Sequence, residues 1–147
     1  MNFQPQNAAF ATEVKTSFAK QTVMTSIGAQ LTRVEPGVCE ITLPYKTDLT
    51  QQNGFLHAGI VTTIADSACG YAAYSLMPAN SDVLSVEFKV NLMRPAKGAS
   101  FVAVAEVLKP GRTLTIVRAD VFAVDEQGQR VLVVTMLGTM MCVQAKS

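Results

Sequence analysis

Apolar and polar residues alternate along much of the second half of the chain, with the period of two that is typical of β-strands. The clearest run is 83–92, where alternate residues from Leu84 onward are apolar and the residues between them are polar. Three further strand-like runs follow at 100–108, 113–124 and 131–143, separated by turns that contain Pro, Gly or Asp. The pattern predicts a four-stranded antiparallel meander. Its last run is apolar on both faces, which suits a strand that is buried in the sheet and also contacts another subunit.

The first part of the chain begins with a helical pattern. Aromatic and valine residues recur every four positions between residues 8 and 19, which predicts a short helix there. Two strands are expected next, at 30–34 and 38–43, because they flank the turn Glu35-Pro36-Gly37.

The middle of the chain contains the longest predicted helix. A polar loop, 45–54, leads into residues 57–76, which are small or apolar nearly all round and contain no Pro. Such a segment is expected to be buried rather than to lie on a surface. Together these elements predict one domain, 1–147, of the α+β class, in which a curled antiparallel sheet wraps around one long central helix.

Composition bears on the surroundings of this domain. Hydrophobic residues make up 49% of the chain and charged residues only 16%. This is little polar surface for a small domain, so we expect partner subunits to cover part of its outside. The net charge of +1 gives no electrostatic footprint for nucleic acid or for an anionic membrane.

The cysteines and the apolar segments indicate where in the cell the protein is expected. The three cysteines, Cys39, Cys69 and Cys142, lack metal-binding spacing and are interpreted as small apolar residues of a reducing compartment. The first ten residues show no signal-peptide pattern. Residues 59–77 include Asp66 and several hydroxyl residues, which argues against a membrane span. We therefore expect a cytoplasmic protein.

The segment from Asn53 to Gly59 is the most informative candidate for chemistry. A glycine-containing turn that leads into a helix leaves backbone N–H groups without partners at the positive end of the helix dipole. Such groups can bind a developing oxyanion. Asp66 follows His57 by nine residues, about two and a half turns into the helix. A carboxylate in so apolar a helix is costly unless it is solvated, paired or functional.

Plainer interpretations of the same residues stay open. His57, the only histidine, could simply cap the helix or satisfy a buried carbonyl group. Asp66 could lie at a subunit contact or be hydrogen-bonded within the core. Gly54 and Gly59 could be ordinary turn or packing glycines. The residues alone therefore define a candidate site.

Several motifs together resemble the PaaI-like branch of the hotdog thioesterase superfamily, over about residues 28–143. That branch has a His-Gly-Gly turn opening its central helix, an acidic residue nine positions later, and a strand ending in an Arg-Pro-Ala turn. The matching residues here are His57-Ala58-Gly59, Asp66, Arg94-Pro95-Ala96 and a further Gly111-Arg112 turn. Two departures are Ala58, in place of the first glycine, and Gln51, where several relatives carry Asn.

The resemblance implies a hotdog fold and hydrolysis of the thioester of a small or medium acyl- or aryl-CoA, without a cofactor. Asp66 would be the general base or the nucleophile, and the backbone N–H of Ala58 or Gly59 would bind the carbonyl oxygen. His57 would position the loop or the thioester. Ser85 would help to orient the attacking water.

The resemblance also implies how substrate and subunits are arranged. Gln51, or Asn53 nearby, would take the place of the water-binding Asn. Active sites of the family lie between two subunits, which implies a homo-oligomer, at least a dimer, and the apolar second face of 131–143 favours a tetramer. The phosphates of coenzyme A would contact basic residues in the turns, which otherwise are solvated charges: Arg94, Lys97, Lys109 and Arg112, the last beside Gly111.

Other classes of function fit the residues less well. A hotdog dehydratase or hydratase pairs a histidine with an acid at a different spacing. A non-catalytic acyl-CoA-binding module would not need Asp66. A lone histidine offers no metal-ligand cluster, and no Walker-type loop is present. The sequence does not identify the acyl group, although its pocket is expected to include residues such as Tyr71, Tyr74 or Met77.

Overall fold

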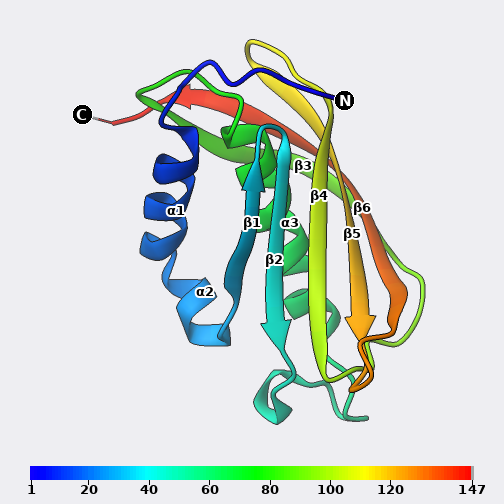
Figure 1. The fold of residues 1–147 in the computed structure, drawn as a ribbon. Coiled ribbons are helices and arrows are strands. Elements are labelled where there is room, and N and C mark those ends of the chain that lie inside the picture. The colour runs from blue at the N-terminus through cyan, green and yellow to red at the C-terminus, as the bar shows by residue number, and fades with distance from the viewer. Residues whose placement is uncertain (147) are drawn as a thin grey trace.

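One curved antiparallel sheet wraps around a central helix in the computed structural model, which describes residues 1–146 (Figure 1). The helix is α3 (Ala58–Tyr74), and the N-terminal helix α1 (Phe10–Lys20) lies beside the first strand. The strands are β1 (Gln30–Glu35), β2 (Val38–Pro44), β3 (Ser81–Leu92), β4 (Ser100–Lys109), β5 (Leu114–Val124) and β6 (Arg130–Gln144). This confirms the predicted α+β architecture.

The order of the strands differs from the predicted meander. In space they run β1-β2-β4-β5-β6-β3, so β4, β5 and β6 form a three-stranded meander and β3 pairs with β6 at the far edge. The prediction of a four-stranded meander was therefore wrong. Alternation identifies a strand but not its neighbour, and here β2 occupies the place beside β4 that the prediction gave to β3.

A β-bulge changes which side chains of β3 face the helix. The pairing of β3 with β6 shifts between Ser85 and Glu87, so that Ser85 lies opposite the buried Met140 while Phe88 lies opposite Gly138. The expectation of a single apolar face from Leu84 to Leu92 was therefore wrong. The bulge inserts one extra residue into the strand, and the side chains on either side of it exchange faces.

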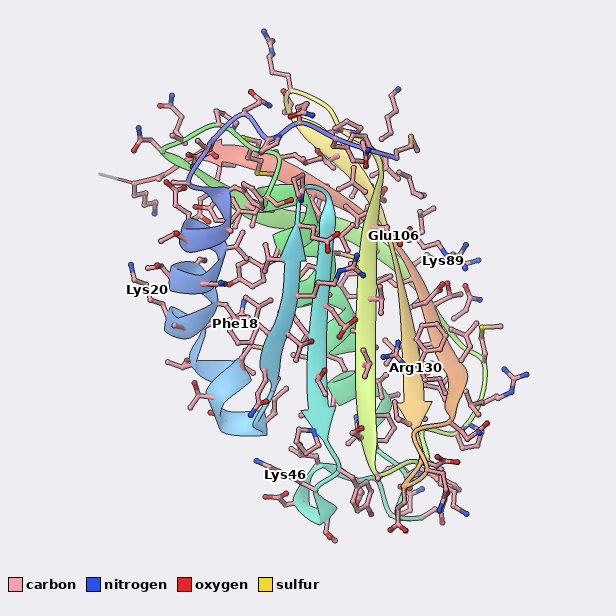
Figure 2. All side chains as sticks on the ribbon, viewed as in Figure 1. Phe18, Lys20, Lys46, Lys89, Glu106 and Arg130 are labelled. Atoms are coloured by element: carbon pink, nitrogen blue, oxygen red, sulfur yellow. The ribbon has the colours of Figure 1, made fainter. Side chains whose placement is uncertain are left out.

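The core lies between α3 and the concave face of the sheet. The helix contributes Ile64, Ala65 and Ala68, which are fully buried, and the sheet contributes residues such as Ile41 and Met136. Small residues on the helix allow the sheet to approach it closely, as the dense packing of protein interiors requires. Charged side chains such as Lys89, Glu106 and Arg130 project elsewhere, away from this core (Figure 2).

The N-terminal region contains a second helix that the sequence pattern did not predict. This helix, α2 (Thr22–Ile27), is separated from α1 by the extended residue Gln21 and ends at Gly28, whose φ of 82° favours glycine. Six residues are too few to show a clear helical period. Helix α1 packs near α3, where the Ser17 hydroxyl lies 3.3 Å from the Tyr71 hydroxyl. None of the helices within residues 1–146 is long and apolar enough to cross a membrane.

Candidate active site

His57 caps the start of helix α3. Its extended backbone (φ −60°, ψ 137°) turns the chain into the helix, and its Nδ1 accepts a hydrogen bond from the backbone N–H of Gly59 at 2.8 Å. Its own backbone N–H donates to the carbonyl of Leu49 at 3.0 Å, which fixes the preceding loop. The structure thus supports the plainer interpretation of His57 as a cap.

This cap leaves one backbone donor free. The N–H of Gly59 is occupied by His57, and those of Ile60 and Val61 donate to the His57 carbonyl. Among residues 1–146, no acceptor is assigned to the N–H of Ala58. Ala58 is an exposed residue, and its N–H lies at the positive end of the helix dipole. Of the two candidate oxyanion donors, Ala58 is therefore the one that is available, and its methyl group does not remove the N–H.

Asp66 and Ser85 are in direct contact. The Ser85 hydroxyl donates to Oδ1 of Asp66 at 2.7 Å, across the gap between α3 and β3. The bulge in β3 turns Ser85 toward the helix and so makes this contact possible. Asp66 is half-buried, and no ion pair involves it within the described part of the chain. The carboxylate is thus oriented by a neutral donor and keeps its remaining lone pairs free to accept a proton.

Asp66 faces a small, polar hollow of about 150 Å³. Its walls come from α3, from the start of β3, from α1 and from the link between α1 and α2, through Ser17, Gln21, Ser67, Tyr71 and Asp82. The Ser67 hydroxyl donates to Oε1 of Gln21 at 3.0 Å. Ser17 and Gln21 were not predicted as site residues, because nothing in the pattern of the N-terminal region indicates that it reaches the carboxylate.

The residues expected around the acyl group are separated in the structure. Tyr71 lines the Asp66 hollow, and its burial raises the pKa of its hydroxyl. Tyr74 instead lies against α1, where its hydroxyl is 3.4 Å from a carboxylate oxygen of Glu13. Met77 is buried beyond the end of α3 and lines a different hollow. Only one of the three is therefore near Asp66.

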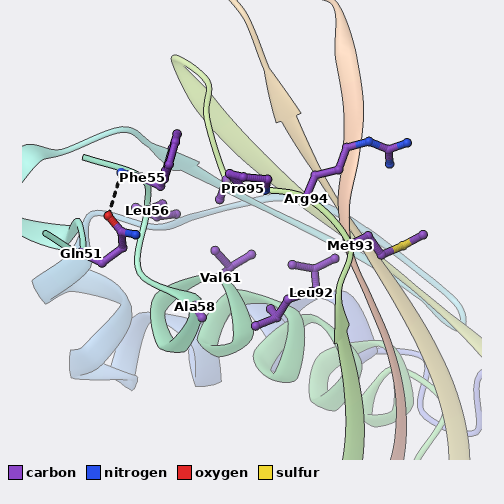
Figure 3. Close-up of a pocket in the computed structure, with 11 residues that line it drawn as sticks. Gln51, Phe55, Leu56, Ala58, Val61, Leu92, Met93, Arg94 and Pro95 are labelled. Atoms are coloured by element: carbon purple, nitrogen blue, oxygen red, sulfur yellow. Dashed lines mark hydrogen bonds between the residues drawn. The ribbon is translucent and has the colours of Figure 1, made fainter. Parts of the chain in front are cut away.

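A second hollow, of about 420 Å³, opens at the start of α3 (Figure 3). Mostly apolar side chains line it, including Phe55, Val61 and Leu92, together with Ala58. Gln51 is also in its wall, but Oε1 of Gln51 accepts hydrogen bonds from the backbone N–H groups of Asn53 and Phe55. Gln51 thus stabilises the loop before the helix and keeps only its amide N–H groups for a ligand.

The two hollows share no lining residue. Asp66 is eight residues beyond Ala58, so their backbones are about 12 Å apart along the helix axis. A thioester carbonyl bound by the Ala58 N–H is therefore out of reach of Asp66 in the same chain. A site that uses both groups needs a second chain.

The four basic candidates also fall into two groups. Arg94 lines the hollow at the helix start, donates from Nη1 to the carbonyl of Leu132 at 2.9 Å, and points its remaining donors away from the hollow (Figure 3). Lys97 lines a neighbouring hollow. Arg112, with Gly111, lines a hollow near the opposite end of α3, and Lys109 is exposed at the end of β4. One chain does not bring all four together.

Gly111 has a steric reason to be glycine. A Cβ atom at this position would lie 2.1 Å from the carbonyl oxygen of Leu114, closer than any real contact. The Gly111-Arg112 motif is therefore explained by a tight turn between β4 and β5, whatever Arg112 binds.

Two of the three thiols are unsuited to act as nucleophiles. Burial raises the pKa of Cys39 to about 12, and burial followed by the nearby Asp66 charge raises the pKa of Cys69 as well. Both remain protonated at neutral pH and behave as small apolar residues. Residues 1–146 contain no group of three or more His, Cys, Asp or Glu side chains arranged to hold a metal ion.

Comparisons with known proteins identify the class of this chain. A family model described as the thioesterase superfamily matches residues 53–130. This segment contains the helix cap, Asp66 and Ser85. The chain therefore belongs to the thioesterase superfamily, and its enzyme class is that of the thioester hydrolases.

Individual relatives extend the likeness over most of the chain. It is similar to a solved thioesterase family protein from Silicibacter pomeroyi, with 50% identity, a TM-score of 0.90 and coverage of 92% of this chain and 99% of that one. The PaaI protein from the E. coli phenylacetic acid degradation operon has the same fold, with a TM-score of 0.82, 15% identity and coverage of 96% and 98%. A Saccharolobus solfataricus relative, provisionally named an esterase, is 29% identical over 86% of this chain and 81% of its own. The fold is thus the hotdog fold, as predicted.

Proposed function

We propose that this protein hydrolyses acyl-coenzyme A thioesters and that Asp66 is its catalytic carboxylate. The observation that carries the proposal is the half-buried Asp66, oriented by the Ser85 hydroxyl at 2.7 Å and facing a hollow. As a general base, Asp66 takes a proton from water while the water oxygen attacks the thioester carbonyl. As a nucleophile, it attacks the carbonyl itself, and water then cleaves the resulting anhydride. In both routes the C–S bond breaks and the thiolate leaves and is protonated.

The site is proposed to form between two chains. Because Asp66 and Ala58 lie about 12 Å apart along one helix, the oxyanion donor that serves Asp66 comes from a second copy. Strand β3 supports this arrangement, since it is an unpaired edge that exposes Leu84, Val86 and Leu92 to 54%, 53% and 55%. Antiparallel pairing of two β3 strands would continue the sheet and set the two α3 helices side by side in opposite directions.

Further parts of the proposal rest on single features. Leu137 of β6 is 51% exposed, which favours association of two dimers into a tetramer. The three free cysteines favour a reducing compartment such as the cytoplasm. In the second chain, the Gln51 amide N–H groups and Asn53 would bind water or substrate beside Ala58, and Gly59 and His57 would keep the helix start in place.

The acyl group is proposed to be small or medium in size. The hollow beside Asp66, of about 150 Å³, is lined mostly by polar side chains and suits the attacking water better than an apolar chain. The apolar walls around the acyl group would therefore come in part from the partner chain.

A free-thiol release assay tests the proposal. Wild type and the variants Asp66→Ala and Asp66→Asn would be compared on short, long and aromatic acyl-CoAs. We expect hydrolysis by the wild type and a loss of kcat of at least about 100-fold in both variants, with the oligomer intact. Full turnover by Asp66→Asn would contradict the carboxylate assignment. No hydrolysis of any thioester by folded wild type would favour a dehydratase or a binding module.

A proline substitution tests the oxyanion donor. Ala58→Pro removes only the free N–H, because proline is well tolerated at the first position of a helix and His57 already has the extended backbone that precedes proline. We expect kcat to fall by about 100-fold or more, whereas Ala58→Gly, which keeps the N–H, stays near wild type.

Mixing the two inactive variants tests whether the site is shared. In a heterodimer of Asp66→Asn and Ala58→Pro, one of the two shared sites carries both substitutions and the other carries neither. We therefore expect activity to return when the purified variants exchange subunits. If each site lies within one chain, no mixture would recover activity.

A further inference from the structure

The helical N-terminal region is interrupted at Gln21, although no helix-breaking residue stands there. Residues 10–27 contain neither Pro nor Gly, yet Gln21 is extended (φ −79°, ψ 91°) between α1 and α2 (Figure 1). Glutamine is a good helix former. Its backbone N–H donates to the carbonyl of Phe18 at 3.0 Å, and its carbonyl accepts the N–H of Met24 at 3.0 Å. Local propensity does not explain this interruption, so a contact with another part of the chain is expected to hold it.

That contact is made with α3, next to Asp66. Oε1 of Gln21 accepts a hydrogen bond from the Ser67 hydroxyl at 3.0 Å. Ser67 follows Asp66 directly on α3, and all three residues line the hollow beside Asp66. Since Ser67 engages the amide oxygen, the orientation of the amide is fixed. Within residues 1–146 no acceptor is assigned to its nitrogen, so Gln21 presents two oriented N–H donors at the wall of this hollow.

The rest of the wall is rich in hydrogen-bond acceptors. The other polar side chains of the hollow are two carboxylates and four hydroxyl groups: Asp66, Asp82, Ser17, Ser67, Tyr71 and Ser85. Ser67 and Ser85 donate their hydrogens to Gln21 and Asp66. The hydroxyl groups of Ser17 and Tyr71 lie 3.3 Å apart and share one hydrogen bond. The side-chain donors left free are therefore the amide hydrogens of Gln21 and one hydroxyl hydrogen of that pair.

A water molecule in this hollow needs a donor to fix its oxygen atom. The volume of about 150 Å³ has room for a few water molecules. The Asp66 carboxylate accepts one hydrogen of such a water, which is the proton that a general base removes. A carboxylate cannot bind the lone pairs of the water oxygen, the atom that attacks the thioester carbonyl. An N–H group that donates to one lone pair fixes the oxygen and leaves the other lone pair free for the attack.

We propose that Gln21 positions the attacking water beside Asp66 and that Ser67 holds the Gln21 amide in place. The inference rests on the proposed thioesterase function and deepens it. Asp66 takes one proton of the water, the water oxygen bonds to the carbonyl carbon, and the Gln21 N–H keeps its own proton throughout. If Asp66 is the nucleophile, the same water cleaves the anhydride. The interruption between α1 and α2 is the feature that brings this amide to the site.

Two substitutions of Gln21 separate its donors from its contact with Ser67. Gln21→Glu keeps an oxygen that accepts from Ser67 but has no N–H group, whereas Gln21→Met keeps the length of the side chain and makes neither contact. In thiol release from one acyl-CoA, we expect kcat to fall about ten-fold in both variants, because a hydrogen bond to the water is lost. KM should stay unchanged, because the substrate loses no contact. Gln30→Met, at an exposed glutamine outside the hollow, should match the wild type.

The pattern of the two variants separates positioning from structural support. Full activity in Gln21→Glu with a loss in Gln21→Met would mean that only the contact with Ser67 matters, and would overturn the proposal. A loss in Gln21→Glu alone would mean that the added charge acts on Asp66, and would overturn it as well. Full activity in both variants would have the same consequence. Absence of hydrolysis by wild type would instead overturn the proposed function itself.

Subunit exchange gives a second test, since Gln21 and Asp66 line the same hollow of one chain. In a heterodimer of Gln21→Met and Ala58→Pro, one shared site carries no substitution, so activity should rise above that of either variant alone. In a heterodimer of Gln21→Met and Asp66→Asn, each site carries one substitution, so activity should not exceed the average of the two variants. A gain in the second mixture and none in the first would place Gln21 opposite Asp66 across the interface and overturn the proposal.

Discussion

The two edges of the sheet are built differently, although each carries a hydroxyl that donates to a carboxylate. On β1, Thr32 donates to Glu40 at 2.9 Å, and both groups lie on the outside of the sheet. On β3, Ser85 donates to Asp66 at 2.7 Å, and the contact faces the central helix. The same pair of groups is thus a surface contact at one edge and part of the candidate site at the other.

The two edge strands also differ in length and in the side chains that they expose. Strand β1 has six residues, and the Arg33–Glu35 ion pair at 2.8 Å exposes charge along it, which discourages pairing with another strand. Strand β3 has 12 residues and exposes large apolar side chains, such as Leu84 and Val86, beside the charged Glu87 and Lys89. The longer and more apolar edge is the one that carries Ser85, so the surface available for association and the candidate site coincide.

The largest effect should come from placing charge on the β3 edge. In Leu84→Asp, a carboxylate would replace an exposed apolar side chain of the proposed β3–β3 contact, and we expect dissociation to monomers and a loss of kcat of at least about 100-fold. Thr32→Asp on β1 is the matched control and should change neither property. Sedimentation and thiol release measured at the same protein concentration would decide the point. A fully active monomer would show that activity does not depend on association through β3.

A smaller effect is expected from the two hydroxyl groups. Ser85→Ala removes the donor that orients Asp66, so we expect kcat to fall by about ten-fold while KM and the oligomeric state stay unchanged. Thr32→Ala removes the equivalent donor from Glu40 and should leave kcat as it is. Steady-state kinetics of both variants on one acyl-CoA would measure the difference. Equal kcat values for the two would show that Ser85 has no orienting role.

The smallest effect concerns the charges on β1. Replacing Arg33 and Glu35 by threonine should leave the midpoint of urea unfolding nearly unchanged, because exposed ion pairs contribute little. The same double variant should self-associate more at high concentration, since the edge loses its protection. Urea unfolding and light scattering would test the two statements separately. A large loss of stability would mean that the ion pair has a structural role.

The helices and strands were predicted well from the sequence, but the pairing of the strands was not. The sequence patterns and turns identified all six strands nearly to their ends, and the small residues of α3 identified the buried helix. The position of β3 beside β6 depends on contacts between distant segments, which periodicity does not record. The bulge near Ser85 is equally invisible, since the apolar residues continue to alternate through it.

The candidate site was predicted in part. Resemblance to the family named both Asp66 and Ser85, and the structure brings them into contact. The resemblance also gave the N–H groups of Ala58 and Gly59 as alternative oxyanion donors. Only the structure distinguishes them, because the Gly59 N–H already donates to the His57 side chain. Ser17 and Gln21 could not be predicted, because they reach the hollow from the N-terminal region, which lies outside the matched segment.

Helix α3 has one more consequence, for the order in which the protein folds. Two glycines and the run of β-branched residues from Val61 to Ile64 give the segment 58–74 low helix propensity, so the isolated peptide should be mostly unstructured. The helix is held by strands that are distant along the chain, and such non-local contacts form slowly. Its amides should gain protection from hydrogen exchange only as the sheet closes. Asp66 would therefore reach Ser85 late in folding, after the strands have found their partners.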